Sequence, residues 1–143
     1  MTTARSIHHA SPILRAMQAR AGVLFLPREM ADELSLRYHI SLALLGAGHG
    51  SHYHLMYVTE ILLLTFVLTE AGYGNLPASE FITALAGASA ALHRGNREDK
   101  WYLDRGAINQ FGEILELHDW QLVSASAPEI AAAHNKATAM LVR

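Results

Sequence analysis

The sequence predicts an all-α protein: a compact bundle of about six helices in a single domain. Proline, glycine and capping residues divide the 143-residue chain into segments of helical length. Within these segments apolar residues recur every three or four positions, which is the spacing of one face of a helix. No run of alternating β-branched residues, which would indicate a strand, competes with this pattern.

The first two helices are predicted from prolines at their starts. Ser11 before Pro12 has the arrangement of an N-cap followed by a first helical residue, and this helix should run over 11–21. We expect residues 1–10 to be a flexible basic arm and residues 11–143 to be a single helical domain. A second helix should begin at Pro27 and end at the glycines 46, 48 and 50. Its inward face should carry Leu34, Tyr38, Ser41 and Leu45.

The third helix, predicted over 52–71 with Ser51 as its cap, is apolar on all sides. Such a helix must be buried at the centre of a bundle or shared with a partner, so it should be the most buried element. We expect Leu62 and Phe66 in the core. The apolar stretch is interrupted by Glu60 and is shorter than the roughly 20 residues that a membrane span needs.

Three further helices complete the prediction. A fourth should begin at Pro77 and present small side chains for close helix approach, and residues 93–104 should form a charged connecting loop. Asp104 is then the N-cap of a fifth helix. Ser126 and Glu129 form a capping box at the start of the sixth. The inward seam of the fifth helix should carry Ile108, Phe111, Leu115, His118 and Leu122.

Composition excludes several classes of function. The absence of cysteine excludes disulfides, thiolate metal sites and a thiol nucleophile. A net charge of −2 provides no overall field that would attract nucleic acid. The amino terminus lacks the apolar stretch of a signal peptide, so we expect a cytoplasmic protein, and the preference for Arg over Lys suggests a bacterial one.

A histidine cluster at the junction of the second and third helices could form a metal site. Neutral imidazoles ligate Zn, Fe or Ni, and a glycine-flanked turn can bring His49 and His52 together. A metal site also needs a third ligand, and the nearest carboxylate in the sequence, that of Glu60, is about two helical turns away. A metal-dependent enzyme using His49, His52 and His54 is therefore kept as an alternative, while the main expectation is no cofactor and no tightly bound transition metal.

The dipeptide His118-Asp119 is similar to the metal-binding dipeptide of the HD phosphohydrolases, but the aspartate that this family needs downstream is missing. We therefore expect His118 to be a hydrogen-bonded core histidine. Asp119 is expected on a solvated face with Glu113 and Glu116.

Binding by the segment Arg94 to Asp104 is the preferred functional hypothesis, because aromatic residues and arginine carry much of the energy of interfaces. Its candidate contact residues are Arg94, Arg97, Lys100, Trp101 and Tyr102. The competing explanation is that Trp101 folds back onto the bundle as a lid. A nucleic-acid accessory factor using 94–102 is a second alternative, opposed by the acids that neutralise the segment.

Together these observations predict a non-catalytic helical interaction protein, an adaptor, regulator or inhibitor of the kind found in phages and mobile elements. We expect a protein partner rather than nucleic acid or a membrane. A homodimer is a further expectation, because the third helix has more apolar surface than one neighbouring layer can cover and the fourth has a small-residue face.

Overall fold

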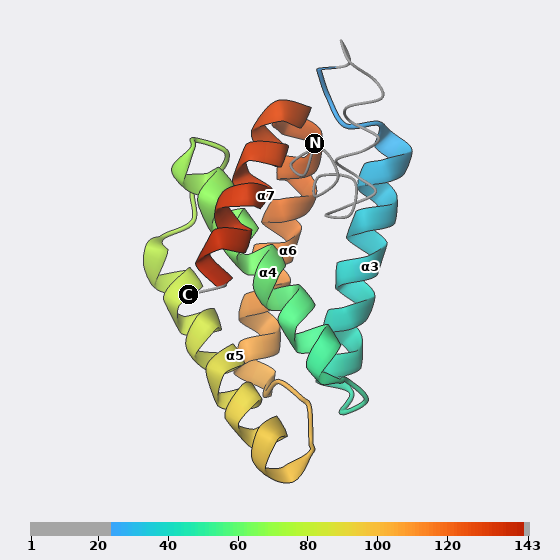
Figure 1. Ribbon diagram of the computed structural model, residues 1–143, viewed down its shortest axis with the longest axis vertical. Coiled ribbons are helices and arrows are strands. Elements are labelled where there is room, and N and C mark those ends of the chain that lie inside the picture. Colours follow the sequence, from blue (N-terminus) through green and yellow to red (C-terminus); the bar gives the residue numbers. More distant parts are fainter. Residues whose placement is uncertain (1–23, 142–143) are drawn as a thin grey trace, which may run out of the picture.

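The computed structural model describes residues 24–141, and these form five α-helices (Figure 1). They are α3 (Arg28–Gly46), α4 (His52–Glu70), α5 (Ala78–Glu98), α6 (Arg105–Ser124) and α7 (Ala127–Leu141). In this range there is no strand, only an isolated bridge between Phe25 and Ser126. The all-α prediction is confirmed, with five helices where about six were expected. The helix predicted over 11–21 and the arm over 1–10 lie outside the described residues.

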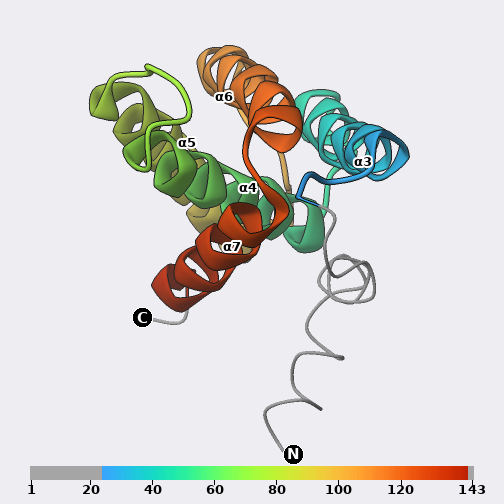
Figure 2. The same cartoon turned by 90° about the horizontal axis from the view of Figure 1, so that it is seen from above.

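Helix α4 is the centre of the bundle. Viewed from above, α3, α6 and α5 form an arc along one side of α4, and α7 lies on its other side (Figure 2). Helix α4 packs against all four other helices, while α6 also packs against α3 and α5. Seven apolar residues of α4 are therefore buried within one chain and four more are partly buried, while Tyr53 near the start of the helix is 63% exposed.

The burial of α4 follows from this central position. Nine of its residues are buried, among them Leu62. Phe66 differs from the prediction, because it is only half-buried and lies at the edge of the core, its ring edge-on to Phe81 at 5.4 Å between centroids. By length and composition α4 could also cross a membrane. Its place among four helices is that of a core helix.

Hydrogen bonds confirm the three predicted caps Ser51, Asp104 and Ser126, whereas α3 and α5 begin one residue after Pro27 and Pro77, with no side-chain cap. Ser51 accepts a hydrogen bond from the backbone N–H of His54, and Asp104 accepts one from Ala107 at 2.9 Å. At the start of α7 the capping box is complete. The Ser126 N–H donates to the Glu129 carboxylate, and the Glu129 N–H donates to the Ser126 hydroxyl.

The predicted loop over 93–104 is partly wrong, because α5 continues to Glu98. Charged residues such as Arg and Glu are good helix formers, so a dense run of charge does not end a helix. The helix ends where Asp99 adopts a left-handed φ of 55° and its N–H bonds to the carbonyl of Gly95 at 2.8 Å. Only a short connection, 99–104, then leads to α6.

The small side chains of α5 allow close approach to a neighbouring helix of the same chain. A Cβ added at Gly87 would lie 2.8 Å from the Cβ of Ala107 on α6. Ala84, Ala88 and Ala91 are buried on the same side. The buried small residues of α5 are therefore used within the fold.

Candidate functional site

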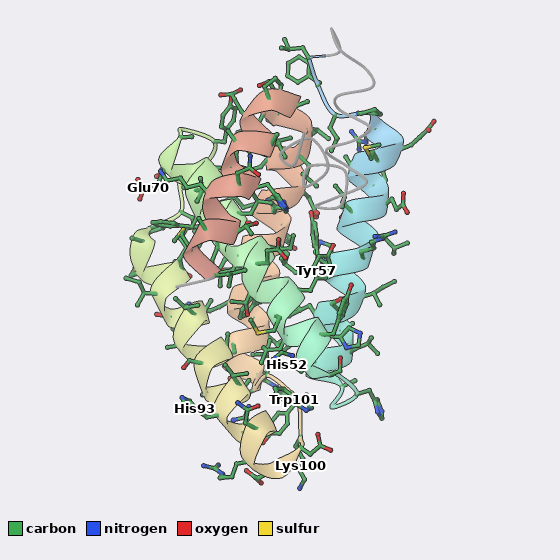
Figure 3. All side chains as sticks on the ribbon, in the orientation of Figure 1. His52, Tyr57, Glu70, His93, Lys100 and Trp101 are labelled. Carbon is green, nitrogen blue, oxygen red and sulfur yellow. The ribbon has the colours of Figure 1, made fainter. Side chains whose placement is uncertain are left out.

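The two clusters singled out in the sequence meet at one end of the bundle. The connections α3–α4 and α5–α6 both lie there (Figure 1), and the Leu103 N–H donates to the Leu45 carbonyl at 3.3 Å. His52, Trp101 and Lys100 are neighbours at this end (Figure 3). The ring of His52 is edge-on to that of Trp101, with 5.2 Å between centroids.

The aromatic residues of the α5–α6 connection are engaged within the fold. Trp101 is half-buried against Gly95, where an added Cβ would lie 2.3 Å from the indole. Its Nε1 donates to Asp99 at 3.2 Å. The Arg94 guanidinium donates to the Tyr102 carbonyl at 2.8 Å and lies 4.0 Å from the centre of the Tyr102 ring. These contacts favour the explanation in which Trp101 is a lid.

Two cations of the predicted contact set point outward. Arg97 and Lys100 are both exposed, and Arg97 pairs with Glu98 at 3.2 Å. An exposed ion pair of this kind contributes little to stability. The outer surface of the connection therefore offers mixed charge, not a continuous basic patch.

The histidine cluster is not gathered around one point. His49 and His52 are exposed, and the Nδ1 of His54 lies 3.0 Å from the Ser51 hydroxyl that caps α4. Across residues 24–141 no group of three or more His, Asp or Glu side chains could hold a metal ion. The alternative metal site thus lacks a third ligand in this part of the chain.

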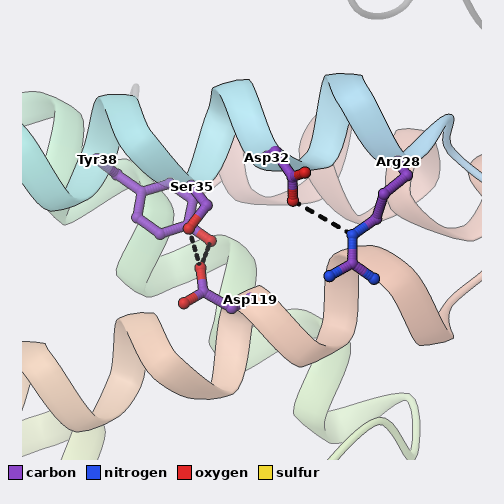
Figure 4. A network of polar contacts seen from close by, with 5 residues as sticks. All are labelled: Arg28, Asp32, Ser35, Tyr38 and Asp119. Carbon is purple, nitrogen blue, oxygen red and sulfur yellow. Dashed lines mark hydrogen bonds and ion pairs between the residues drawn. The ribbon is translucent and has the colours of Figure 1, made fainter.

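A polar cluster that the sequence analysis missed joins α3 to α6. Ser35 donates to Oδ1 of Asp119 at 2.7 Å, and the Tyr38 hydroxyl donates to the same oxygen (Figure 4). The Nε2 of His39 lies 2.9 Å from Oδ2. The predicted solvated face is confirmed for Glu113 and Glu116, which are exposed, but not for Asp119. Asp119 is only partly exposed, because its carboxylate is the common acceptor of three side chains from α3. The spacing of the three donors, i, i+3 and i+4, places them on one face of a helix, but it does not identify their acceptor.

The electrostatics of this cluster follow from its position. The side chains of Asp119 and His39 are each 37% exposed, whereas Tyr38 is fully buried. Burial alone would raise the pKa of the Asp119 carboxyl, but the three hydrogen bonds from α3 outweigh it and leave that pKa below its usual value. Burial, together with the hydrogen bond to the neighbouring carboxylate, raises the pKa of Tyr38. Near neutral pH the cluster is therefore a carboxylate bound by a neutral phenol.

Behind Asp119, His118 and Gln121 form a buried network, which confirms the prediction of a core histidine. Gln121 Nε2 donates to the Thr65 carbonyl at 3.1 Å and to the Tyr73 carbonyl at 2.8 Å. Gln121 Oε1 can only accept, so the Nδ1 of His118 at 2.9 Å carries the proton. Burial lowers the pKa of His118 to about 4, and the hydrogen bond offsets only part of this effect. His118 is therefore neutral near pH 7.

The chemistry of the Asp119 cluster is that of a structural tie. A serine nucleophile needs an effective general base in contact with its hydroxyl, and the carboxylate that Ser35 contacts is a weak base, because its pKa is lowered. Here Ser35 and His39 bind different oxygens of the same carboxylate, and the hydrogen bonds found in residues 24–141 do not join them to each other. The cluster fixes the position of α3 against α6.

The outer face of α3 is the clearest surface feature. Leu36 is 60% exposed and Ile40 is 49% exposed, one turn apart on the side opposite the buried Tyr38 and Leu45. Ala43 and Ala47 are exposed and continue the same line, so the four positions are spaced 4, 3 and 4. We call these four residues the outer stripe. Helix α3 is thus apolar on two opposite faces, and the sequence analysis identified only the inner one.

Comparisons of the chain with known protein families, curated proteins and solved structures find no match.

Proposed function

We propose that this chain is a non-catalytic interaction protein that binds a protein partner through the outer stripe of α3. The supporting observation is the exposure of Leu36 and Ile40 on a single helix face. A surface helix usually carries one apolar face, which it turns to its own core. A second apolar face that the residues of 24–141 leave exposed is the usual anchor of a helix that docks onto another helix or groove.

The contrast with α4 supports this assignment. Helix α4 is apolar all round, and four helices of the same chain pack against it and bury nine of its residues. Within residues 24–141, α3 packs mainly on α4 and α6, and its outer stripe is exposed. Helix α3 therefore carries an exposed apolar line that can support association.

The position of α3 also suits a docking surface. Three of its side chains hydrogen-bond Asp119, which holds the helix in one orientation on α6. A rigid surface loses less conformational entropy on binding than a flexible one. The outer stripe is thus presented by an anchored helix.

Capture of partners from cells that naturally express the chain tests the proposal, with identification by mass spectrometry. Tagged wild-type protein should enrich a defined partner, which can include untagged copies of the chain itself. Ile40→Lys should reduce that enrichment by about tenfold or more, because a buried charge is costly at an apolar contact. Ile82→Lys is the matched control, since Ile82 is 67% exposed on α5. Equal capture by all three proteins would refute a role for the outer stripe.

A further inference from the structure

We infer that the outer stripe binds a second copy of this chain, with the two α3 helices antiparallel, so that Leu36 lies opposite Ala47 and Ile40 opposite Ala43 of the other copy. This inference rests on the proposed function and specifies its partner. The homodimer expected from the sequence was based on the third and fourth predicted helices, which are α4 and α5. The surface of self-association inferred from the structure is on α3 instead.

The order of side chains along the outer stripe makes it complementary to itself. Two large residues, Leu36 and Ile40, are followed by two small ones, Ala43 and Ala47. In an antiparallel pair each large side chain meets a small one, so the helices can approach closely along their whole contact. A parallel pair would place the large residues against each other and leave a gap between the alanines. Only the antiparallel arrangement packs the stripe evenly.

The spacing of the stripe fits this arrangement. Steps of 4, 3 and 4 are those of the a and d positions in a coiled-coil seam. In the proposed register every a position faces a d position. The two copies are related by a two-fold axis between Ile40 and Ala43, which gives a closed dimer in which both copies use the same surface.

Repulsion between like charges disfavours the alternative antiparallel register, in which Leu36 would face Ile40. If Leu36 faced Ile40 instead, each Arg37 would lie only about 3 Å along the axis from the Arg37 of the other copy, given a rise of 1.5 Å per residue. Glu33 would then also face Ala43 inside the seam. In the proposed register the two Arg37 residues are separated by about 13 Å along the axis, beyond the screening length of physiological salt. Glu33 lies past the end of the paired segment.

The size of the surface predicts a weak dimer. One pair of four-residue stripes buries less than the roughly 1,200 Å² of a standard stable interface. A dissociation constant in the micromolar range or weaker is expected. On α5 the exposed Ile82 and Leu85 are also neighbours, but this apolar patch is shorter, because Ser89 and His93 follow Ile82 on the same face.

Sedimentation equilibrium of the full, untagged chain, from micromolar to near-millimolar concentration, measures this dimer. Wild-type protein should show a reversible monomer–dimer equilibrium. Ile40→Lys should weaken the dimer by about tenfold or more, and Ile82→Lys should leave it unchanged. Circular dichroism checks that each variant is folded. A monomer at every concentration, or equal dimerisation of wild type and Ile40→Lys, would overturn the inference.

Cysteine cross-linking tests the register, since the chain has no cysteine of its own. The double variant Leu36→Cys with Ala47→Cys should form a disulfide-linked dimer on mild oxidation. Its two thiols lie about 16 Å apart along one helix and cannot pair within a chain. Either single variant should cross-link far less. Equal cross-linking by the single variants would contradict the register. A monomeric chain that still captures another protein through Ile40 would refute the dimer but preserve the proposed function.

Discussion

Removal of the Asp119 carboxylate should lower the free energy of unfolding, because three side chains of α3 lose the acceptor of their hydrogen bonds. In Asp119→Ala the fully buried Tyr38 hydroxyl loses its acceptor, and an unpaired buried donor costs about 1–3 kcal/mol. Contacts to Ser35 and His39 are partly exposed, so solvent screening reduces the contribution of each to below about 1 kcal/mol. The expected loss in the free energy of unfolding is about 2–4 kcal/mol in total.

A double-mutant cycle measured by urea denaturation isolates the central contact. Tyr38→Phe alone should cost about 1 kcal/mol, since Asp119 keeps two other donors. The double variant should cost less than the sum of the single variants by about 1–2 kcal/mol, because no hydroxyl is left unpaired. Glu116→Ala, an exposed acid one turn away on α6, is the control and should change stability by less than about 0.5 kcal/mol. Additive losses, or a loss from Asp119→Ala equal to that of the control, would refute the role of Asp119 as a tie.

Further expectations concern pH, the core and the α5–α6 connection. Because the pKa of His118 is about 4 in the folded state and near 6.5 when unfolded, the unfolded chain binds an extra proton between these values. The free energy of unfolding should therefore fall as pH drops from 6.5 toward 4, by up to about 3 kcal/mol, and His118→Gln should flatten this dependence in denaturation curves recorded across that range. Leu62→Ala should cost about 2–5 kcal/mol and Phe66→Ala less, because only Leu62 is fully buried; a larger loss at Phe66 in urea denaturation would contradict this order. Gly95→Ala should displace the indole of Trp101, with a red shift of its fluorescence and a loss of about 1–3 kcal/mol; an unchanged emission spectrum would place the indole elsewhere.

Helix starts could be predicted from sequence because a cap acts within one turn. Ser51, Asp104 and Ser126 each bind a backbone N–H three residues further on. The core position of His118 was also predictable, since it falls in an apolar seam of regular spacing. The end of α5 was not, because Asp99 ends the helix through a backbone conformation that the charge pattern does not indicate.

The Asp119 cluster and the outer stripe could not be identified from sequence. Asp119 is separated from its donors on α3 by about eighty positions, so nothing local indicates that the two helices are neighbours. For Leu36 and Ile40, apolar character alone does not tell which face of a two-sided helix is covered. The proposed site was therefore found only when the neighbours of α3 were known.

The sequence by itself determined the all-helical class, the places where helices begin and the core residues of regular spacing, because caps and periodicity are interactions within a few residues. Only the tertiary structure decided that α4 packs against four helices of its own chain, that Asp119 binds α3, and that the outer stripe is exposed. Each of these depends on which helices pack together. Packing arises from contacts between residues distant in the chain, and local patterns do not encode their pairing.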